Sequence, residues 1–388
     1  MLEMFANRRV LLLQGPAGPF FRRVARQLRD RGATVTKVNF NAGDDLYYQG
    51  SEVVHYRGNF EQWRQFVTDL CRREQIEVLL LFGDCRPYHR VAKEQARTLD
   101  IAIYVFEEGY LRPDFVTLEQ GGVNGTSPMP KDPAFYLGLS PTPVPKPTSI
   151  GNVMPRAAWY ATAYAVTHGL LASRYPHYHH HRSIRPFEQA GLWVRGAARR
   201  VLRSKHDQSI DARIAAATLP PYYLVPLQVH LDAQMQHSPF ESVDQFIRTV
   251  VRSFALHAPS DTVLMIKHHP LDRGYCDYTA LLDELGEEHQ LGQRLLYVDA
   301  VNLPAALRAA RGTVVINSTV GLSSIHHGTP VKCLGTAVYD MPGLTFQRPL
   351  DVFWGQLGRI NPTLYRRFRW WLRTNNQING SVWTQLYL

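Results

Sequence analysis

The chain has 388 residues, with 45% hydrophobic and 20% charged residues, which is typical of a folded globular protein large enough for two domains. Its formal net charge of +10 favours anionic partners such as lipid headgroups or acidic substrates, although a basic surface without a partner explains the charge equally well. The four cysteines have neither metal-ligand spacing nor a disulfide framework, and no apolar run approaches the ~20 residues of a membrane span. With no signal-peptide pattern at its start, the protein is expected in the cytoplasm.

The first part of the chain alternates between strand and helix patterns. Apolar runs predict buried strands at 9–14, 34–38, 77–82 and 101–106. Amphipathic spacing predicts helices at 20–31, 60–73 and 89–98. This alternation is typical of a doubly wound α/β domain.

A second α/β region follows a connector and a basic segment. Residues 141–155 are rich in proline, serine and threonine, and residues 157–203 are aromatic, basic and partly helical by pattern. Strands are then predicted at 222–227, 262–266, 295–298, 313–316 and 331–334, with helices at 242–257 and 303–310 between them.

These patterns predict an α/β protein of the GT-B type, with two Rossmann-like domains facing each other across a cleft. The expected parts are an N-terminal, acceptor-side domain at 1–218, a C-terminal, donor-binding domain at 219–348, and a helical tail at 349–388 that packs back on the N-terminal domain. Two such domains also occur in other nucleotide-dependent enzymes, so the fold alone does not decide the function.

Polar clusters follow several predicted strands, at the sheet edge where open α/β sheets bind ligands. They are Glu107 and Glu108 after the strand at 101–106, Lys267, His268 and His269 after 262–266, and Asn317, Ser318 and Thr319 after 313–316. The last cluster opens a helix, and helix N-termini bind phosphate. Taken singly, each cluster has an ordinary alternative: a solvated turn, a structural histidine or a helix cap.

Gln228 and Asp232 follow the first strand of the second region. A carboxylate there would enter the cleft from the side opposite Glu107 and Glu108. Retaining glycosyl transfer by double displacement needs such a pair, one carboxylate as nucleophile and the other as acid/base. The competing interpretation is a loop aspartate that caps the next turn.

Other polar segments give weaker signals. Residues 15–19 lack the third glycine of a dinucleotide fingerprint and are interpreted as a turn that lets the backbone approach an acceptor. The histidine-rich run at 175–181 is better explained by a basic aromatic surface than by a metal site. No Asp-X-Asp element is present to hold a metal on a sugar nucleotide, so no metal is expected. No nucleic-acid recognition module is found, and nucleic acid is not an expected partner.

Five motifs together resemble those of bacterial capsular polysaccharide export and biosynthesis proteins. They are Leu13-Gln14-Gly15-Pro16, Phe82-Gly83-Asp84-Cys85-Arg86-Pro87, Phe106-Glu107-Glu108-Gly109-Tyr110-Leu111-Arg112-Pro113, Lys267-His268-His269-Pro270 and Ile316-Asn317-Ser318-Thr319. The resemblance covers nearly the whole chain and is weaker at 141–155 and in the tail. The family is similar to bacterial retaining β-Kdo glycosyltransferases, and its signatures are also similar to those of bacterial sialyltransferases.

The resemblance implies transfer of the first Kdo from CMP-β-Kdo to phosphatidylglycerol or lyso-phosphatidylglycerol, which starts the poly-Kdo linker of group 2 capsules. It implies a peripheral enzyme at the inner face of the bacterial inner membrane, with an anionic membrane surface and other capsule assembly and export proteins as partners. No cofactor is expected, and CMP-Kdo is the donor substrate. The alternative is a non-catalytic adaptor that binds anionic lipid or polysaccharide for a capsule exporter.

The expected roles fall into three groups. In catalysis, Asp232 is the nucleophile and Glu108 the acid/base, with Glu107 as the fallback. The expected donor-binding residues are Gln228, Lys267, His268, His269, Asn317, Ser318, Thr319 and Gly335. The expected acceptor-side residues are Gly15, Gly18, Asp84, Arg86 and Arg112.

Overall fold

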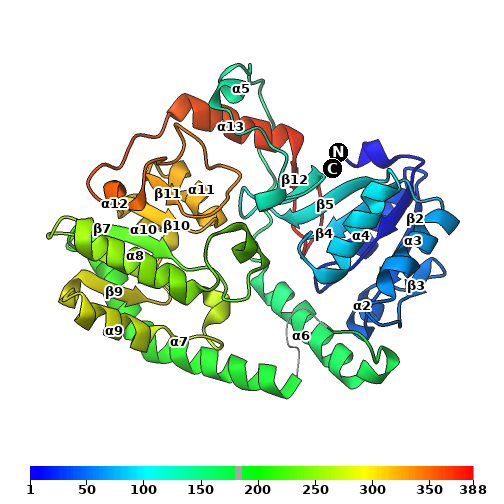
Figure 1. Cartoon of the computed structure of the whole chain (residues 1–388), viewed down its shortest axis with the longest axis horizontal. Coiled ribbons are helices and arrows are strands. Elements are labelled where there is room, and N and C mark those ends of the chain that lie inside the picture. The colour runs from blue at the N-terminus through cyan, green and yellow to red at the C-terminus, as the bar shows by residue number, and fades with distance from the viewer. Residues whose placement is uncertain (180–185, 388) are drawn as a thin grey trace. The chain divides into compact units, whose positions relative to one another are not determined.

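The computed structural model describes residues 1–179 and 186–387, which form two compact units (Figure 1). The first unit comprises Met1–Pro128, Thr142–Glu188 and Trp371–Leu388, and the second comprises Met129–Pro141 and Gln189–Trp370. The boundaries expected at 218/219 and 348/349 therefore differ from the structural ones. The basic segment at 157–203 is divided at residue 188/189, with its larger part in the first unit, and only the end of the tail returns to the first unit.

The sheet of the first unit has the strand order β12-β6-β5-β4-β1-β2-β3. Its parallel part consists of β1 (Arg9–Leu12), β2 (Thr34–Asn39), β3 (Val53–His55), β4 (Val78–Phe82) and β5 (Ala102–Glu108). Two antiparallel strands that the sequence patterns missed, β6 (Phe115–Gln120) and β12 (Gln377–Asn379), extend it beyond β5. The pairing of β12 with β6 attaches the C-terminal end of the chain to this unit.

Helices cover both faces of this sheet, because successive strand residues point to opposite sides. Val10 and Leu12 of β1 pack in the core that contains residues of α1 (Phe20–Arg29). Leu11 and Leu13 pack in the opposite core, which contains residues of α3 (Trp63–Arg73) and α4 (Pro87–Thr98). Two further helices, α2 (Ala42–Tyr47) and α6 (Met154–Leu170), contact each other.

The second unit has a fully parallel sheet with the order β11-β10-β7-β8-β9. Its strands are β7 (Tyr222–Pro226), β8 (Val263–Lys267), β9 (Leu295–Val298), β10 (Gly312–Val315) and β11 (Val331–Cys333). Its helices are α5 (Pro133–Leu137), α7 (Pro186–Ala215), α8 (Val243–His257), α9 (Thr279–Glu288), α10 (Leu303–Ala309), α11 (Thr319–His326), α12 (Leu350–Phe353) and α13 (Pro362–Asn375). The first residues of α7 and the last residues of α13 belong to the first unit.

Both parallel sheets have the Rossmann strand order, so the predicted fold class, two Rossmann-like units of the GT-B type, is confirmed. In each unit the first strand is central: β1 lies between β2 and β4, and β7 lies between β8 and β10. The connections leave the central strand in opposite directions, and the resulting switch point is where open α/β sheets bind ligands. Among the residues described, no helix is both long and apolar enough to cross a membrane.

Candidate functional site

The switch point of the second unit joins polar side chains from two neighbouring strand ends. Gln228 follows β7, Asn317 follows β10, and Gln228 Nε2 donates to Asn317 Oδ1 at 2.8 Å. The same Nε2 donates to Asp232 Oδ2 at 3.1 Å. Gln228 is buried, and its Oε1 has no hydrogen-bond partner among the described residues. A buried acceptor is costly to leave unpaired, so this oxygen indicates a place for a ligand or water donor.

Asp232 also caps the short helix η4 (Ala233–His237). Its Oδ1 accepts from the backbone N–H of Gln234 at 2.9 Å, so the turn-capping interaction considered from the sequence is present. Asn317 Nδ2 donates to the carbonyl of the same Gln234 at 2.9 Å. These bonds hold the Asp232 loop against the end of β10.

An open pocket of about 700 Å³ lies at the far end of η4, the short helix that Asp232 caps. It is lined by residues 236–239 at the end of η4 and just after it, by Lys332–Thr336 around the end of β11, and by Asp340. A Cβ at Gly335 would lie 2.9 Å from Ser238 Cβ and 3.1 Å from the His237 carbonyl oxygen, so the two walls meet closely only because residue 335 is glycine. The volume suits a nucleoside-sized ligand.

Helix α11 starts beside the same cluster. Ser318 is its N-cap, and its Oγ accepts from Val320 N–H at 3.3 Å. The Ser318 carbonyl accepts a hydrogen bond from the Tyr339 hydroxyl. Ser318 and Thr319 remain partly exposed at the helix N-terminus, where the partial positive charge favours an anion.

The Lys267-His268-His269 cluster does not act as one surface patch. His268 is fully buried, its Nδ1 lies 2.7 Å from the Tyr297 hydroxyl, and burial lowers its pKa to about 4. His268 therefore packs in the core as a neutral ring. The prediction that it makes a cationic contact with the donor is wrong. Lys267 is also buried, with its pKa lowered to about 8 by burial and by Arg273, and it donates to the His268 carbonyl. Only His269 lies in the loop with partial exposure, as the N-cap of η5 (Pro270–Asp272).

His230 shares the loop with Asp232, and no pattern in the sequence marked it as a site residue. Asp272, at 1% exposure, accepts from His230 N–H at 2.6 Å and lies 2.8 Å from His230 Nδ1. The ligand atoms of His230, Asp272 and Cys276 lie within 4.8 Å of one another, a spacing that a metal ion could bridge. Both Asp272 oxygens are already engaged, and burial raises the pKa of the Cys276 thiol, so these residues fit a structural clamp better than a metal centre.

In the first unit, the two adjacent glutamates at the end of β5 have different environments. Glu107 is half-buried, and burial raises its pKa to about 7, although its Oε1 accepts from Glu108 N–H at 2.9 Å. It lies beside the end of β4, where a Cβ at Gly83 would be 3.6 Å from Glu107 Oε2. Glu108 is more exposed and forms an ion pair with Arg112 at 2.8 Å. A pKa near 7 suits a general acid/base, so this raised pKa favours Glu107, the fallback residue, for that role.

The switch point of the first unit is filled by the chain itself. Gln14 Nε2 donates to the hydroxyls of Tyr178 at 2.8 Å and Tyr164 at 3.1 Å, and Tyr164 donates to Asp44 at 3.1 Å. Arg86 donates to the Gly15 carbonyl at 3.0 Å, which fixes the turn after β1. The adjoining cavity holds about 20 Å³, room for roughly one water molecule.

Two expected acceptor-side residues have structural contacts instead. Asp84 is buried, and its Oδ2 accepts from Lys93 Nζ at 2.6 Å and from the Thr126 hydroxyl at 2.5 Å. Despite burial, the Lys93 ammonium and these hydrogen bonds keep the pKa of Asp84 below its usual value. The prediction that Asp84 meets an acceptor is thus wrong for the folded unit. Gly18 has φ +140°, and a Cβ there would lie 2.9 Å from the Tyr160 ring, so this glycine permits packing of α6.

Of the histidine-rich run, His180 and His181 lie outside the described residues. Asp232 belongs to the second unit and Glu107 and Glu108 to the first, each at the C-terminal edge of its own sheet. Their approach to one sugar stays a prediction.

Comparison with known proteins agrees with the motif pattern. The model of a family described as "Capsule polysaccharide biosynthesis protein" matches residues 77–383. The capsule polysaccharide export protein KpsS of Escherichia coli is 38% identical, over 97% of this chain and 97% of that protein. The capsule polysaccharide modification protein LipB of Neisseria meningitidis is also 38% identical, over 100% of this chain and 94% of that protein.

Among solved structures, the similarity is more distant. Two from Thermosulfurimonas dismutans KpsC, a β-Kdo 2,4 transferase and a β-Kdo 2,7 transferase, are 13% and 15% identical, with TM-scores of 0.46 and 0.44. The alignments cover 93% and 92% of this chain, and 89% and 88% of the two KpsC chains, respectively. The family assignment depends on the sequence matches. The chain belongs to the capsule polysaccharide biosynthesis protein family.

Proposed function

We propose that this chain is a retaining β-Kdo glycosyltransferase that transfers the first Kdo from CMP-β-Kdo to a phosphatidylglycerol-type lipid. The observation that carries the proposal is the joined Gln228, Asn317 and Asp232 cluster at the switch point of the second unit, beside an open pocket. This edge offers what a CMP-sugar requires: space for a nucleoside, a helix N-terminus for an anion and a carboxylate close by.

The donor would occupy the second unit. Backbone groups of Leu334–Thr336 would receive the cytosine, and Ser318 and Thr319 at the start of α11 would contact the phosphate or the Kdo carboxylate. His269, partly exposed at the end of β8, would add a hydrogen bond or a positive charge. No metal is required in this arrangement, because the helix end and the histidine compensate the phosphate charge.

The proposed chemistry proceeds in two displacements. Asp232 attacks the anomeric carbon of Kdo, a carbon–oxygen bond to the carboxylate forms, and CMP leaves with the electrons of the broken bond. In the second step Glu107 takes the proton of the lipid hydroxyl, whose oxygen attacks the same carbon and releases Asp232. Two inversions give net retention. We assign the base to Glu107 rather than Glu108, because its raised pKa suits proton transfer near neutral pH.

The test is incubation of the protein with CMP-Kdo and a fluorescent phosphatidylglycerol, followed by mass spectrometry of the lipid. The expected product is heavier by one Kdo, and its appearance should require both substrates. A control with Asp232→Asn separates enzymatic transfer from contamination. Binding of lipid without any transfer, under conditions in which CMP-Kdo is stable, would favour the adaptor interpretation instead.

A further inference from the structure

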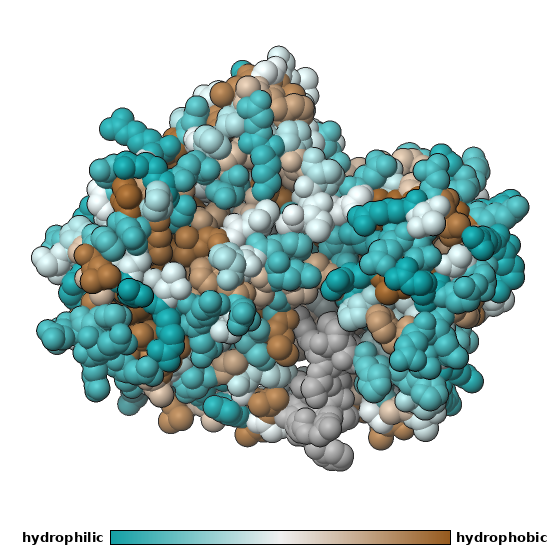
Figure 2. All heavy atoms as spheres, in the orientation of Figure 1, coloured by the Kyte–Doolittle hydropathy of each residue, from teal (hydrophilic) through white to brown (hydrophobic). Residues whose placement is uncertain are grey.

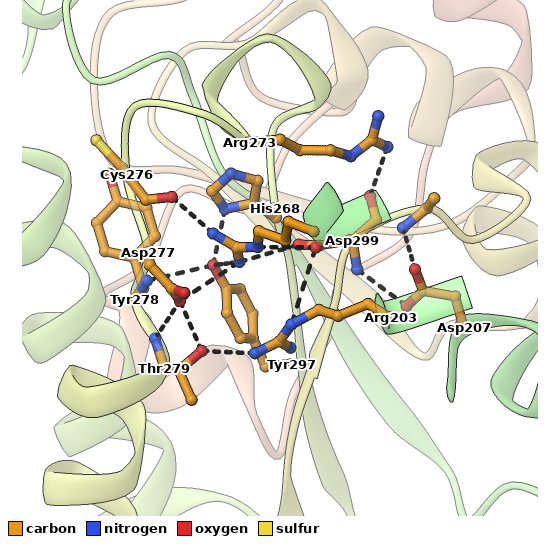
Figure 3. Close-up of polar contacts among 12 residues, drawn as sticks. Arg203, Asp207, His268, Arg273, Cys276, Asp277, Tyr278, Thr279, Tyr297 and Asp299 are labelled. Carbon is orange, nitrogen blue, oxygen red and sulfur yellow. Dashed lines mark hydrogen bonds and ion pairs between the residues drawn. The ribbon is translucent and has the colours of Figure 1, made fainter. Parts of the chain in front are cut away.

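Helix α7 attaches to the second unit through charged side chains instead of an apolar stripe along its whole length. Arg199 donates from Nε to Asp299 Oδ2 at 2.9 Å and from Nη2 to Asp299 Oδ1 at 3.1 Å. Figure 3 shows the polar contacts around Asp299. Asp299 is fully buried. Arg199 also donates to the Tyr297 hydroxyl at 2.8 Å and to the Cys276 carbonyl at 2.7 Å.

The next turns of α7 continue this polar contact. Arg203 donates to the Thr279 hydroxyl at 2.5 Å. One turn further, buried Asp207 accepts from the backbone N–H groups of Asp299 at 3.0 Å and Ala300 at 2.9 Å. The inward positions 199, 203 and 207 follow the spacing of one helix face. Because bidentate and buried charge contacts are geometrically specific, they fix which face of α7 points inward.

The consequence is an outer face that carries apolar side chains. Val194 is 72% exposed, Val201 is 72% exposed and Leu202 is 82% exposed. Trp193 is also exposed. Val194 and Val201 are seven residues apart and therefore lie on one face, opposite the positions that contact Asp299. In Figure 1 this helix runs along the lower edge of the second unit, and Figure 2 shows hydrophobic residues exposed there.

The charges on the same stretch are all positive. Residues 191–206 contain no aspartate or glutamate. With Arg199 and Arg203 turned inward, Arg195, Arg200 and Lys205 are exposed beside the apolar side chains. An apolar face flanked only by arginine and lysine, with a tryptophan at its edge, is the composition of a helix that lies in the interface of an anionic bilayer.

We propose that the outer face of α7, defined by Trp193, Val194, Val201, Leu202 and the flanking Arg195, Arg200 and Lys205, binds an anionic phospholipid surface. The apolar side chains would enter the headgroup boundary and the three cations would pair with lipid phosphates. This surface deepens the proposed function, since a lipid acceptor is reached at a membrane. It would also bring the second unit, which carries the donor pocket, to that membrane.

Charge complementarity favours lipid over the other occupants of such a face. A second copy of this chain would bring together two faces of the same positive sign. The first unit offers an apolar stripe on α6, where Trp159, Val166 and Leu170 are exposed, but it adds no acidic partner on that helix. An anionic membrane thus supplies the negative surface that a second copy of the chain and the apolar stripe on α6 both lack.

The experiment measures sedimentation of the full chain with vesicles of phosphatidylcholine containing 30% phosphatidylglycerol, and with phosphatidylcholine alone. Leu202→Asp should lower binding to the anionic vesicles by about tenfold or more, since it removes an inserted apolar group and adds a repelled charge. The matched control is Leu256→Asp on α8, where leucine is 65% exposed in the same unit; it should leave binding unchanged. Arg200→Gln should lower binding about fivefold, because each cation near an anionic membrane surface contributes ~1 kcal/mol of attraction.

The outcomes separate the occupants. Equal binding by the Leu202→Asp and Leu256→Asp variants would overturn the proposal. A loss of thermal stability in Leu202→Asp alone would mean that protein covers this face, and a concentration-dependent dimer abolished by the same change would assign it to a second copy. Transfer to a detergent-dispersed acceptor should be unaffected by Leu202→Asp. If the wild-type chain transfers no Kdo, the vesicle result still decides the surface, so the two proposals fail separately.

Discussion

Replacing Glu107 by glutamine should remove a pH-dependent loss of stability from the first unit. Burial raises the pKa of Glu107 from 4.5 to about 7, so the folded state holds the proton more tightly than the unfolded state. As pH rises through this window, the unfolded chain ionises first and folding stability is lost. At 1.36 kcal/mol per pKa unit, a pKa shift of this size lowers the free energy of unfolding by about 3 kcal/mol at pH 8.

The measurement is urea unfolding of the wild type and Glu107→Gln at pH 5, 6, 7 and 8. From pH 5 to pH 8, the unfolding free energy of Glu107→Gln should increase relative to that of the wild type by roughly 2 to 3 kcal/mol. This relative increase should level off above pH 7. Glu119, whose pKa burial also raises to about 7, titrates in both proteins and cancels in the difference. Tryptophan fluorescence and circular dichroism together would check that the same transition is followed.

The adjacent glutamate provides the control. Glu108→Gln breaks a largely exposed ion pair with Arg112, which is expected to cost about 0 to 1 kcal/mol, and most of the pH slope should remain. A difference between wild type and Glu107→Gln that stays constant from pH 5 to 8 would refute the reasoning. Loss of the pH dependence of unfolding free energy in Glu108→Gln instead would also refute the reasoning, because the raised pKa would then belong to Glu108.

Three further predictions concern the other site residues. His269→Ala should weaken CMP binding about tenfold without changing the fold, through loss of a phosphate contact; unchanged affinity by calorimetry would remove His269 from the site. Asp232→Ala should abolish transfer and preserve CMP binding, whereas Glu107→Gln should accumulate a Kdo adduct that peptide mapping places on Asp232; an adduct on another residue would contradict the assignment. Lys93→Met leaves the buried Asp84 carboxylate without its cation and should cost about 3 to 5 kcal/mol in chemical unfolding, whereas a negligible cost would contradict its structural role.

Much of the fold follows from local patterns. All nine strands expected from apolar runs are present, because a buried parallel strand needs an apolar side chain at nearly every position. Three strands were missed: β3, which is short and partly exposed, and β6 and β12, which are antiparallel and partly polar. Gln377 of β12 donates from Nε2 to the Thr117 hydroxyl of β6, a pairing of residues far apart in sequence that no local periodicity contains.

The candidate site was predicted less completely, because strand ends reveal where polar groups lie but not their surroundings. The pattern placed Gln228, Asp232 and Asn317 beyond the carboxyl ends of two strands, and the structure joins them there by hydrogen bonds. The same reasoning could not distinguish a buried histidine at 268 from a partly exposed one at 269. His230 was passed over because its partner, Asp272, lies on another loop.

The sequence by itself therefore determined the two Rossmann-like units and the polar edges at which ligands are expected, since hydrophobic periodicity and strand length are local properties. Only the tertiary structure decided which groups are desolvated and which are paired. Glu107 acquires its raised pKa from burial at the end of β4, and α7 acquires its outward apolar face because Asp299, on a distant strand end, holds Arg199 inside. Burial and charge pairing depend on contacts between residues remote in the chain, and folding is what brings those residues together.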